Sequence, residues 1–478
     1  MAGWRLEHSY ARLPDLFYVR STPTPVREPR LVILNRPLAA ALGLDAGALE
    51  GPEGAATLAG NVLPDGSQPL AQAYAGHQFG HFTGLGDGRA ILLGEQITPT
   101  GDRVDIQLKG SGQTRFSRRG DGRAALGPML REYIVSEAMH ALGIPTTRSL
   151  AVVTTGEPVY RETVLDGAVL TRVAASHIRV GTMEWAAAHR DEEAMRALAH
   201  YTAERHYPGL GVGPDTYAAL FDAMTERQAR LIARWQLVGF VHGVMNTDNM
   251  ALSGETLDYG PCAFMDAYDP AAVFSSIDSQ GRYAYGNQPA IAQWNLARLA
   301  EAMLPLIHPD AEEAVKRAET ALRRFAECYE HHWLAGMRAK LGLFTEEADD
   351  RVLVDDLLDW MRHTSADFTN TFRLLITPPP EQGDAAFEAW LVRWQARRAR
   401  QPHASAEGAN LMRRHNPAVI PRNHKVEEAL ESATAGRDLA PLLALLDVLA
   451  SPFDHERDLG GYDAPAALSA PYRTFCGT

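Results

Sequence analysis

The pattern of apolar and polar residues changes partway along the chain. In the first part, short runs of aliphatic and β-branched residues alternate with glycine-rich turns, which is typical of β-strands. These runs predict strands over residues 31–34, 90–93, 104–108, 149–154 and 168–173. One stretch differs, because residues 128–142 carry their apolar side chains at helical spacing and end at Gly143, with Pro145 just beyond. The first part therefore predicts a sheet with one inserted helix.

From about Met183 onward the apolar residues follow the period of amphipathic helices. Helices are predicted over residues 191–203, 217–240, 291–303, 311–339, 346–362, 385–400 and 439–449. The segment 241–267 is an exception, since it is loop-like and rich in Asn, Asp and Gly. The pattern predicts an α+β fold with two lobes: a β-rich lobe over residues 1–175 and a mainly helical lobe over residues 176–478. We expect the chemistry in the cleft between them.

Composition narrows the class of protein. With 46% hydrophobic and 22% charged residues over 478 positions, the chain has the balance of a soluble globular protein. Lys and Arg total 46 against 59 Asp and Glu, a net charge of −13, which argues against a nucleic-acid partner. No apolar run approaches the roughly 18 residues of a membrane span, and the first residues lack a secretory pattern. We therefore expect a cytoplasmic protein with no membrane partner.

The cysteines do not indicate a metal site or a disulfide framework. Cys262, Cys328 and Cys476 form no Cys-x-x-Cys pair, and their number is odd. Cys476 lies three residues from the end of the sequence, where it is either a reactive thiol or an ordinary exposed cysteine. Both interpretations stay open.

Lys109 is the first candidate for chemistry. It is the only lysine among the first 315 residues, and it ends a predicted strand at the expected cleft. Upstream, Gly86, Gly88 and Arg89 precede another strand, where glycines let backbone amides approach an anion. Such glycines more often form only a turn. The nearby lysine is what makes a phosphate site a serious alternative.

The inserted helix supplies an acidic candidate. Glu132 lies beside the apolar stripe of this helix, and Glu137 lies further along it. A carboxylate that reaches Lys109 would fix the ammonium against a phosphate, as the strand lysine and helix glutamate do in protein kinases. An exposed helix glutamate is an equally good interpretation of Glu132.

The strongest local signal lies in the irregular segment. His242-Gly-Val-Met-Asn-Thr-Asp-Asn249 has the offset from His to Asn of a kinase catalytic loop, and Asp258-Tyr-Gly follows where kinases carry a metal-binding Asp-Phe-Gly. Val244 occupies the place of the kinase catalytic aspartate. Asp248 is then the only carboxylate in the loop that can act as a base. A simple capped turn is the alternative interpretation of this loop.

Two further groups are weaker candidates. Arg172 and Arg179 flank the predicted junction of the lobes and can both reach a terminal phosphate, and the segment 118–123 is either a polar loop or an anion-binding lip. His77 and His81 have a spacing of four residues, which can indicate a metal. Glycines disfavour a helix there and no acidic residue is near in sequence, so we expect a packing or hydrogen-bonding role.

Together these segments resemble the selenoprotein O family, kinase-like protein adenylyltransferases also called SelO or YdiU. The resemblance is specific and spans nearly the whole chain, through residues 74–80, 85–90, 107–112, 242–249, 257–261 and 416–422. It implies a protein-kinase-like fold that binds ATP in a flipped orientation. It further implies transfer of AMP to Ser, Thr or Tyr hydroxyls of protein substrates, with a link to redox homeostasis.

The resemblance also implies roles for individual residues. Asn249 and Asp258 would bind Mg²⁺ or Mn²⁺, Asp248 would be the general base, and Glu132 would position Lys109. The remaining nucleotide-binding residues it implies, with Asp258 among them, are Gly86, Gly88, Arg89, Lys109, Asp121, Gly122, Arg172 and Arg179.

Two other functions fit part of the pattern. One is a protein kinase whose base has moved to Asp248, and the other is a non-catalytic pseudokinase scaffold, suggested by Val244. Retention of Lys109, Asn249 and Asp258 argues against the scaffold, which needs no metal ligands.

Overall fold

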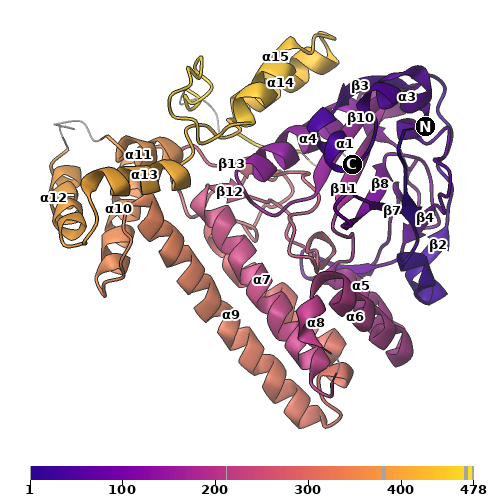
Figure 1. Ribbon diagram of the computed structural model, residues 1–478, viewed down its shortest axis with the longest axis horizontal. Helices are drawn as coiled ribbons and strands as arrows, with labels where there is room; N and C mark the ends of the chain where they lie inside the picture. Colours follow the sequence, from indigo (N-terminus) through magenta and orange to yellow (C-terminus); the bar gives the residue numbers. More distant parts are fainter. Residues whose placement is uncertain (1, 212, 378–383, 468–471, 476–478) are drawn as a thin grey trace.

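A large antiparallel sheet dominates the first part of the chain (Figure 1). The structure is a computed structural model that describes residues 2–211, 213–377, 384–467 and 472–475. The strand order is β2-β4-β7-β8-β11-β10-β3, with β1 paired to β7 and β9 paired to β11. The strands are β1 Leu6–Glu7, β2 Tyr18–Arg20, β3 Arg30–Leu34, β4 Leu70–Gln72, β7 Ala90–Ile97, β8 Arg103–Lys109, β9 Ala124–Ala125, β10 Arg148–Tyr160 and β11 Val164–Ala174.

Two short hairpin-like pairings lie outside this sheet. Strands β5 (Ala75–Gln78) and β6 (His81–Gly84) pair with each other, as do β12 (Phe240–Val241) and β13 (Ala263–Phe264). All five predicted strands are present, and β7, β10 and β11 extend beyond their predicted ends.

The expectation of one helix inserted in the sheet was wrong. The predicted helix is present as α4 (Leu126–Ala141), but three short helices precede it: α1 (Arg36–Ala41), α2 (Ala46–Glu50) and α3 (Pro52–Ala59). The ends of these short helices do carry the sequence signals of helix caps. The side chain of Asn35 accepts from the amide of Leu38 at the start of α1, and Gly60 ends α3 in the left-handed conformation. These helices are too short for helical periodicity to stand out, and they are stabilised by packing their apolar residues on the sheet.

The second part of the chain is mainly helical, as predicted. Helices α7, α8 and α9 pack against one another and extend away from the sheet, at the bottom of Figure 1. Helices α5, α11, α13 and α14 were not predicted. The helices of this part are α5 Val180–Ala188, α6 Glu192–His206, α7 Thr216–Leu237, α8 Gln288–Ile307, α9 Ala311–Lys340, α10 Asp350–Thr364, α11 Phe368–Leu374, α12 Ala385–Ala399, α13 Ser405–His415, α14 Asn423–Thr434 and α15 Ala440–Leu449.

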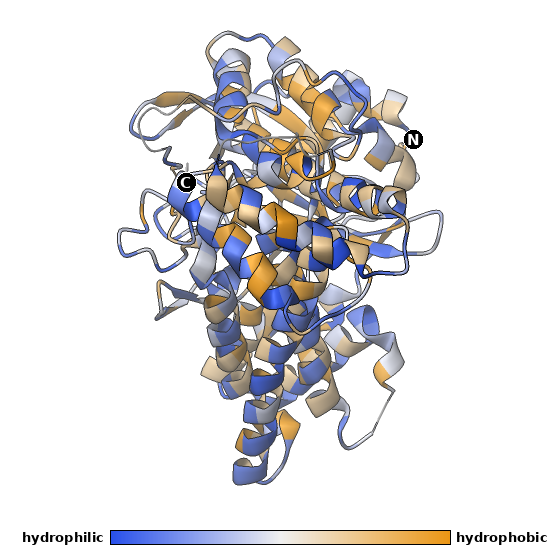
Figure 2. Ribbon diagram, turned by 90° about the vertical axis from the view of Figure 1, so that its left-hand side faces the viewer, coloured by the Kyte–Doolittle hydropathy of each residue, from blue (hydrophilic) through white to orange (hydrophobic). Residues whose placement is uncertain are grey.

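The last two helices return to the sheet. Helices α14 and α15 pack on α4 through a core that joins Leu430 and Leu445 to Leu130 and Ile134 (Figure 1). Apolar residues gather inside the sheet and on the facing sides of the helices, while polar residues line their outer sides (Figure 2). One face of α4 is therefore buried by residues that follow it by about 300 positions in sequence.

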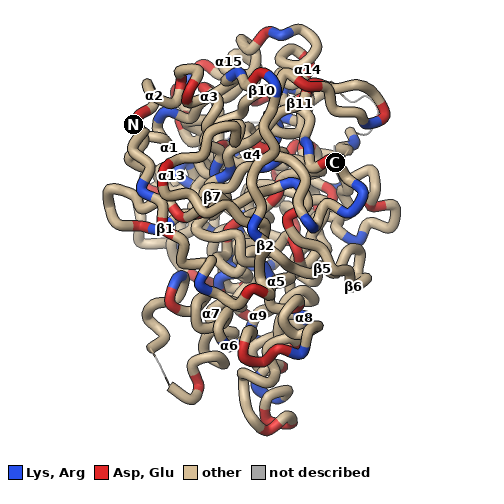
Figure 3. Tube along the Cα trace, turned by 90° about the vertical axis from the view of Figure 1, so that its right-hand side faces the viewer, with Lys and Arg blue, Asp and Glu red and all other residues tan. Residues whose placement is uncertain are grey.

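Charges of both signs are interspersed over the molecule (Figure 3). Among the described residues, no helix is both long and apolar enough to cross a membrane.

Candidate active site

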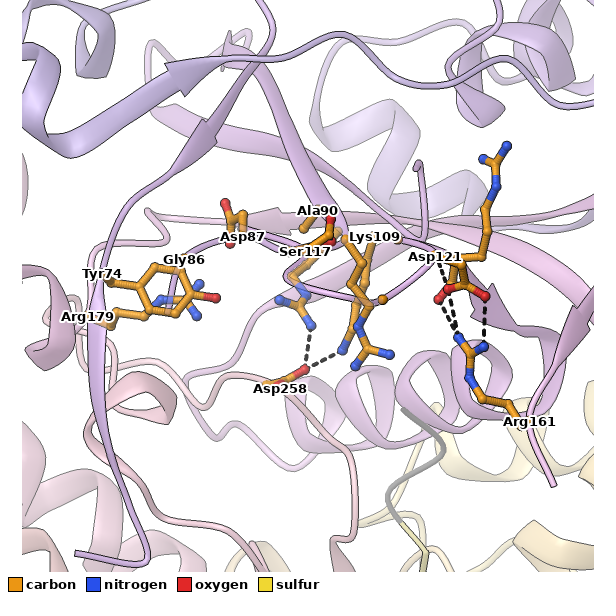
Figure 4. Close-up of a pocket in the computed structure, with 16 residues that line it drawn as sticks. Tyr74, Gly86, Asp87, Ala90, Lys109, Ser117, Asp121, Arg161, Arg179 and Asp258 are labelled. Carbon is orange, nitrogen blue, oxygen red and sulfur yellow. Dashed lines mark hydrogen bonds and ion pairs between the residues drawn. The ribbon is translucent and has the colours of Figure 1, made fainter. Parts of the chain in front are cut away.

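A cavity of about 310 Å³ lies between the sheet and the loop that carries Asp258 (Figure 4). It brings together many of the residues that the sequence singled out. These are Gly86, Gly88, Arg89, Lys109, Asp121, Gly122, Arg172, Arg179 and Asp258. Strands β7, β8 and β11 are neighbours in the sheet, which places the ends of their side chains over one region.

Four charged side chains form a network on one wall of this cavity. Lys109 Nζ lies 2.7 Å from Glu132 Oε2, and it also pairs with Asp258. Arg172 reaches the other oxygen of Glu132 at 2.5 Å and Asp258 Oδ1 at 2.9 Å. Glu132 is 2% exposed, so it is not the exposed helix glutamate of the alternative interpretation. Two cations and two carboxylates are thus held together by β8, α4, β11 and the Asp258 loop.

The network keeps its acids ionised. Burial acts to raise the pKa of Glu132 and of Asp258, but Arg172 and Lys109 more than offset it and lower both. The pKa of Asp258 is held well below its usual range. Asp258 also adopts a left-handed backbone with φ of 67°, a conformation that aspartate tolerates better than most residues. The loop therefore presents a permanently charged carboxylate beside two cations.

The mouth of the cavity is shaped by close backbone approach. Gly86 has φ of 119°, and any side chain there would overlap the ring of Phe116. Asp121 pairs with Arg161 at 2.8 Å, and both residues lie at the rim. Asp121 and Gly122 therefore belong to the lip of a pocket rather than to an isolated polar loop.

Arg179 connects the cavity to the loop of residues 242–249. It precedes α5, its guanidinium stacks over the ring of Tyr74 at 4.1 Å, and its Nη1 donates to the backbone oxygen of Asp248 at 3.1 Å. A backbone bond from Val180 to Met250 O at 2.9 Å reinforces this connection. The start of α5 thus fixes the position of the loop.

Asp248 is a buried carboxylate beside the cavity rather than in its lining. It lies in a short 3₁₀ turn, Thr247–Asn249, and is 9% exposed. Burial raises the pKa of Asp248 to about 7. A side chain at Gly76 would overlap its carboxylate, so β5 covers it closely. Among the described residues, Asp248 Oδ1 has no hydrogen-bond partner.

Asn249 also lies next to the cavity and not in its lining. Its Nδ2 donates to Val244 O at 3.0 Å, which leaves the side-chain oxygen as the atom able to bind a cation. Val244 is buried and carries no ionisable group. The loop thus keeps one carboxylate and one amide oxygen, and the charge of Asp258 acts on the pKa of Asp248.

Sequence reasoning missed several residues that line the cavity. Arg161 comes from the turn between β10 and β11, and its charge alone gave no signal among the many arginines of the chain. Tyr74 begins one of the segments that carried the family resemblance and was the easier one to find. Asp87, Ala90 and Ser117 also line the cavity and were not predicted, whereas Gly120 and Arg123 belong to the segment 118–123, for which an anion-binding lip was one of two interpretations.

Around the histidine pair, as elsewhere in the part of the chain that the structure describes, no cluster of three His, Cys, Asp or Glu side chains that could hold a metal ion occurs. His81 is exposed. His77 Nδ1 lies 2.6 Å from Glu184 Oε1 on α5, an acidic neighbour that is far away in sequence. The His77 ring packs edge-on against Phe82 and Trp294, which is the packing role expected for it, whereas its Nδ1 has no hydrogen-bond partner among the described residues.

The cysteines are separate from this chemistry. Cys262 is fully buried, and burial raises the pKa of its thiol to about 12, so it is an unreactive thiol. Cys328 is half-buried. Cys476 lies outside the described residues, so its reactivity stays a prediction.

A glycine-edged pocket with several cations and a nearby buried carboxylate has the composition of a site that handles phosphate groups. Comparison with known proteins defines the class. Residues 3–450 match the family model described as protein adenylyltransferase SelO. The chain belongs to this family, and it is a nucleotidyltransferase.

Individual relatives agree with this assignment. Proteins named protein nucleotidyltransferase YdiU are similar to the chain over its whole length. The relative from Bacillus cytotoxicus is 60% identical over 481 residues, and the one from Halalkalibacterium halodurans is 61% identical over 482 residues. In each case the match covers 100% of this chain and 98% of the relative.

Proposed function

We propose that the protein transfers AMP from ATP to the hydroxyl groups of Ser, Thr or Tyr residues in other proteins and releases pyrophosphate. The observation that carries this proposal is the pairing of a cation-lined cavity with a separate buried carboxylate, Asp248, in a chain of the SelO family. The sheet, α4 and the helices that follow support a protein-kinase-like arrangement of two lobes, with a boundary near residue 175.

The cations have the task of holding the polyphosphate. Lys109, Arg172 and Arg179 all face the cavity, and the first two are oriented by Glu132. Their positive charge would stabilise the charge that develops on the departing pyrophosphate. Gly86, Gly88, Arg89, Asp121 and Gly122 would contact the rest of the nucleotide at the mouth.

A divalent cation fits the residues present. Asn249 offers an amide oxygen and Asp258 a carboxylate, which are the hard donors that Mg²⁺ or Mn²⁺ takes together with phosphate oxygens. When bound there, the cation would neutralise phosphate charge. Asp258 keeps its negative charge because Lys109 and Arg172 hold its pKa low, so it can serve as a ligand throughout the pH range in which proteins work.

Asp248 would act as the general base. Its pKa of about 7 lets it accept a proton from an acceptor hydroxyl near neutral pH, and its unpartnered Oδ1 has the capacity to do so. Val244 stands where a kinase would carry its catalytic aspartate, which favours a reaction at a different phosphorus atom.

The test is to ask which phosphate of ATP reaches protein. The purified protein is incubated with a bacterial lysate, Mg²⁺ and ATP labelled at either the α or the γ position, with Asp258→Ala as the control. Labelling from the α position only, lost in the variant, would support AMP transfer. Labelling from the γ position only would identify a kinase with a displaced base, and ATP binding with no labelling would favour a scaffold. Repeating the assay with UTP and with Mn²⁺ decides nucleotide and metal preference.

The link to redox homeostasis rests on the family resemblance alone. A comparison of α-label transfer under reducing and oxidising conditions, with Cys476→Ser alongside, would test it. Equal transfer in all four samples would remove this part of the proposal.

A further inference from the structure

His77 and Glu184 form a buried contact that the proposed chemistry does not use. Glu184 is 4% exposed and lies on α5, whereas His77 lies on β5. Nδ1 of His77 is 2.6 Å from Glu184 Oε1, but the orientation of this close contact is not that of a hydrogen bond, and within the described residues neither atom has a hydrogen-bond partner. Burying an acid without a hydrogen-bond partner costs free energy, and such groups in a native structure are candidates for a functional role.

Both residues converge on Thr247, which precedes Asp248. The backbone N–H of His77 donates to Thr247 Oγ1 at 2.7 Å, so the hydroxyl must direct its own proton elsewhere. Burial raises the pKa of Glu184 to about 7, and the nearby Thr247 hydroxyl acts against that rise, while in the described part of the chain neither Glu184 oxygen has a hydrogen-bond partner. Thr247 is 0% exposed, so no water competes for it.

Other contacts hold the loop of residues 242–249 without reaching Oδ1 of the Asp248 carboxylate. Arg179 holds the loop from the cavity side by bonding the backbone oxygen of Asp248, at the start of the same helix that carries Glu184. Asn246 is held from the residue that follows β5, because the amide of Phe79 donates to its Oδ1 at 3.1 Å. Among the described residues, Asp248 Oδ1 receives no hydrogen bond from a side-chain or backbone donor.

We propose that Glu184 and His77 are positioning residues for the general base: they fix Thr247, and through Thr247 they aim the Asp248 carboxylate at the acceptor hydroxyl. Glu184 and Thr247 do not contact the nucleotide cavity, so their contribution falls on the rate of transfer and not on ATP binding. This inference rests on the proposed AMP transfer.

The test separates rate from binding. Transfer of α-label to protein gives kcat and the KM for ATP, and equilibrium titration gives the Kd for ATP. Thr247→Val removes the hydroxyl at nearly constant volume, and Thr247→Ser keeps it. The matched control is Thr202→Val, because Thr202 is equally buried and bonds only within α6.

We expect Thr247→Val to lower kcat by about 30-fold or more, since a misplaced catalytic group costs up to about 100-fold. Its Kd for ATP should stay within about 3-fold of wild type, and Thr247→Ser should recover most of the rate. Glu184→Leu should behave as Thr247→Val, whereas Glu184→Gln, which still offers an oxygen to both neighbours, should keep most of the rate. Thr202→Val should match wild type.

Two results would overturn the inference while leaving AMP transfer intact: an active wild type with Thr247→Val and Glu184→Leu at full rate, or equal losses of rate and ATP affinity in these variants. If Thr247→Val does not fold, Glu184→Leu against Glu184→Gln gives the same decision. A wild-type protein that transfers no α-label would instead overturn the proposed function and this inference with it.

Discussion

Two carboxylates that lie ten residues apart are treated in opposite ways by the structure. Asp258 is surrounded by Lys109 and Arg172, and its pKa is held well below its usual range. Asp248 has no ion-pair partner among the described side chains, and burial raises its pKa to about 7. One acid is made a fixed charge by cations, and the other is made a group that gains or loses a proton near neutral pH. This is the pattern by which two acids in one site take different roles.

The largest loss of activity is expected when one of the cations next to Asp258 is removed. Lys109→Met keeps much of the stem but leaves Glu132 and Asp258 with Arg172 alone. We expect kcat/KM for AMP transfer to fall about 10³-fold, since the loss of one stabilising donor costs 10² to 10³. Unfolding should also become easier by about 3 kcal/mol, because a buried pair is broken.

The control for that variant is Lys316→Met, at an exposed lysine on α9 whose one ion pair among the described residues is with Glu313. It should leave both activity and the unfolding midpoint in urea unchanged. Full activity of Lys109→Met would contradict a phosphate-binding role for the network.

Asp248→Asn removes the proposed general base and leaves Lys109 and Arg172 in place around Asp258. We expect kcat to fall on the order of 10²-fold, which is the usual contribution of a general base, with the Kd for ATP nearly unchanged. Parallel measurement on Asp258→Asn should show loss of ATP affinity as well. Equal losses of ATP affinity in the two variants would contradict separate roles for Asp248 and Asp258. Asp447→Asn, at an exposed position on α15, serves as the control.

Glu184, a buried acid on α5, also predicts a pH dependence of stability. Burial raises the pKa of Glu184 to about 7, above its usual value, so the folded protein binds a proton that the unfolded chain releases. This contribution to stability is complete below the unfolded pKa of roughly 4.5 and is lost as the pH rises through 7. In Glu184→Gln, the fall in unfolding free energy between pH 5 and pH 7.5 should therefore be smaller than in wild type, by up to about 3 kcal/mol.

Urea denaturation at the two pH values measures this difference. Glu204→Gln, at an exposed position on α6, should keep the wild-type pH dependence. An identical slope for Glu184→Gln and wild type would mean that Glu184 is ionised in the folded protein, like the acids near Lys109.

The smallest effect is expected at the rim. Arg161→Ala breaks a pair with Asp121 in which both side chains are partly exposed to water. Such pairs contribute about 0.2 to 1 kcal/mol, so the KM for ATP should rise by no more than about 5-fold. Steady-state kinetics measure it, with Arg196→Ala as an exposed control on α6. A larger rise would show that Arg161 contacts the nucleotide directly.

The residues around Asp258 were predicted from the sequence better than those around Asp248. Lys109 was conspicuous as an isolated lysine, and its pairing with Glu132 follows from a known arrangement of a strand and a helix. Arg172 and Arg179 were weaker candidates, because arginines are common in the chain. Arg172 lies on a predicted strand, whereas α5, which begins directly after Arg179, was not predicted. Asp248 was identified as the available carboxylate, but nothing in its local sequence indicated how deeply it is buried.

The contacts around the loop of residues 242–249 could not be predicted because they join segments that are distant in sequence. Glu184 meets His77 across 107 residues, and the close approach of Gly76 to Asp248 depends on how β5 lies over the loop. Helices α1, α2 and α3 were missed for a different reason, since they are short and owe their stability to the sheet beneath them.

The packing of α14 and α15 on α4 has a consequence for synthesis on the ribosome. Glu132 lies on α4, and the apolar face of that helix is completed only by residues near 430 and 445. When the sheet, Lys109 and Asp258 have left the ribosome, the nascent chain still lacks α14 and α15, the helices that pack on α4 and hold Glu132 in place. We therefore expect the nucleotide site to mature late, after nearly the whole chain has left the exit tunnel, so that truncated translation products do not compete for ATP.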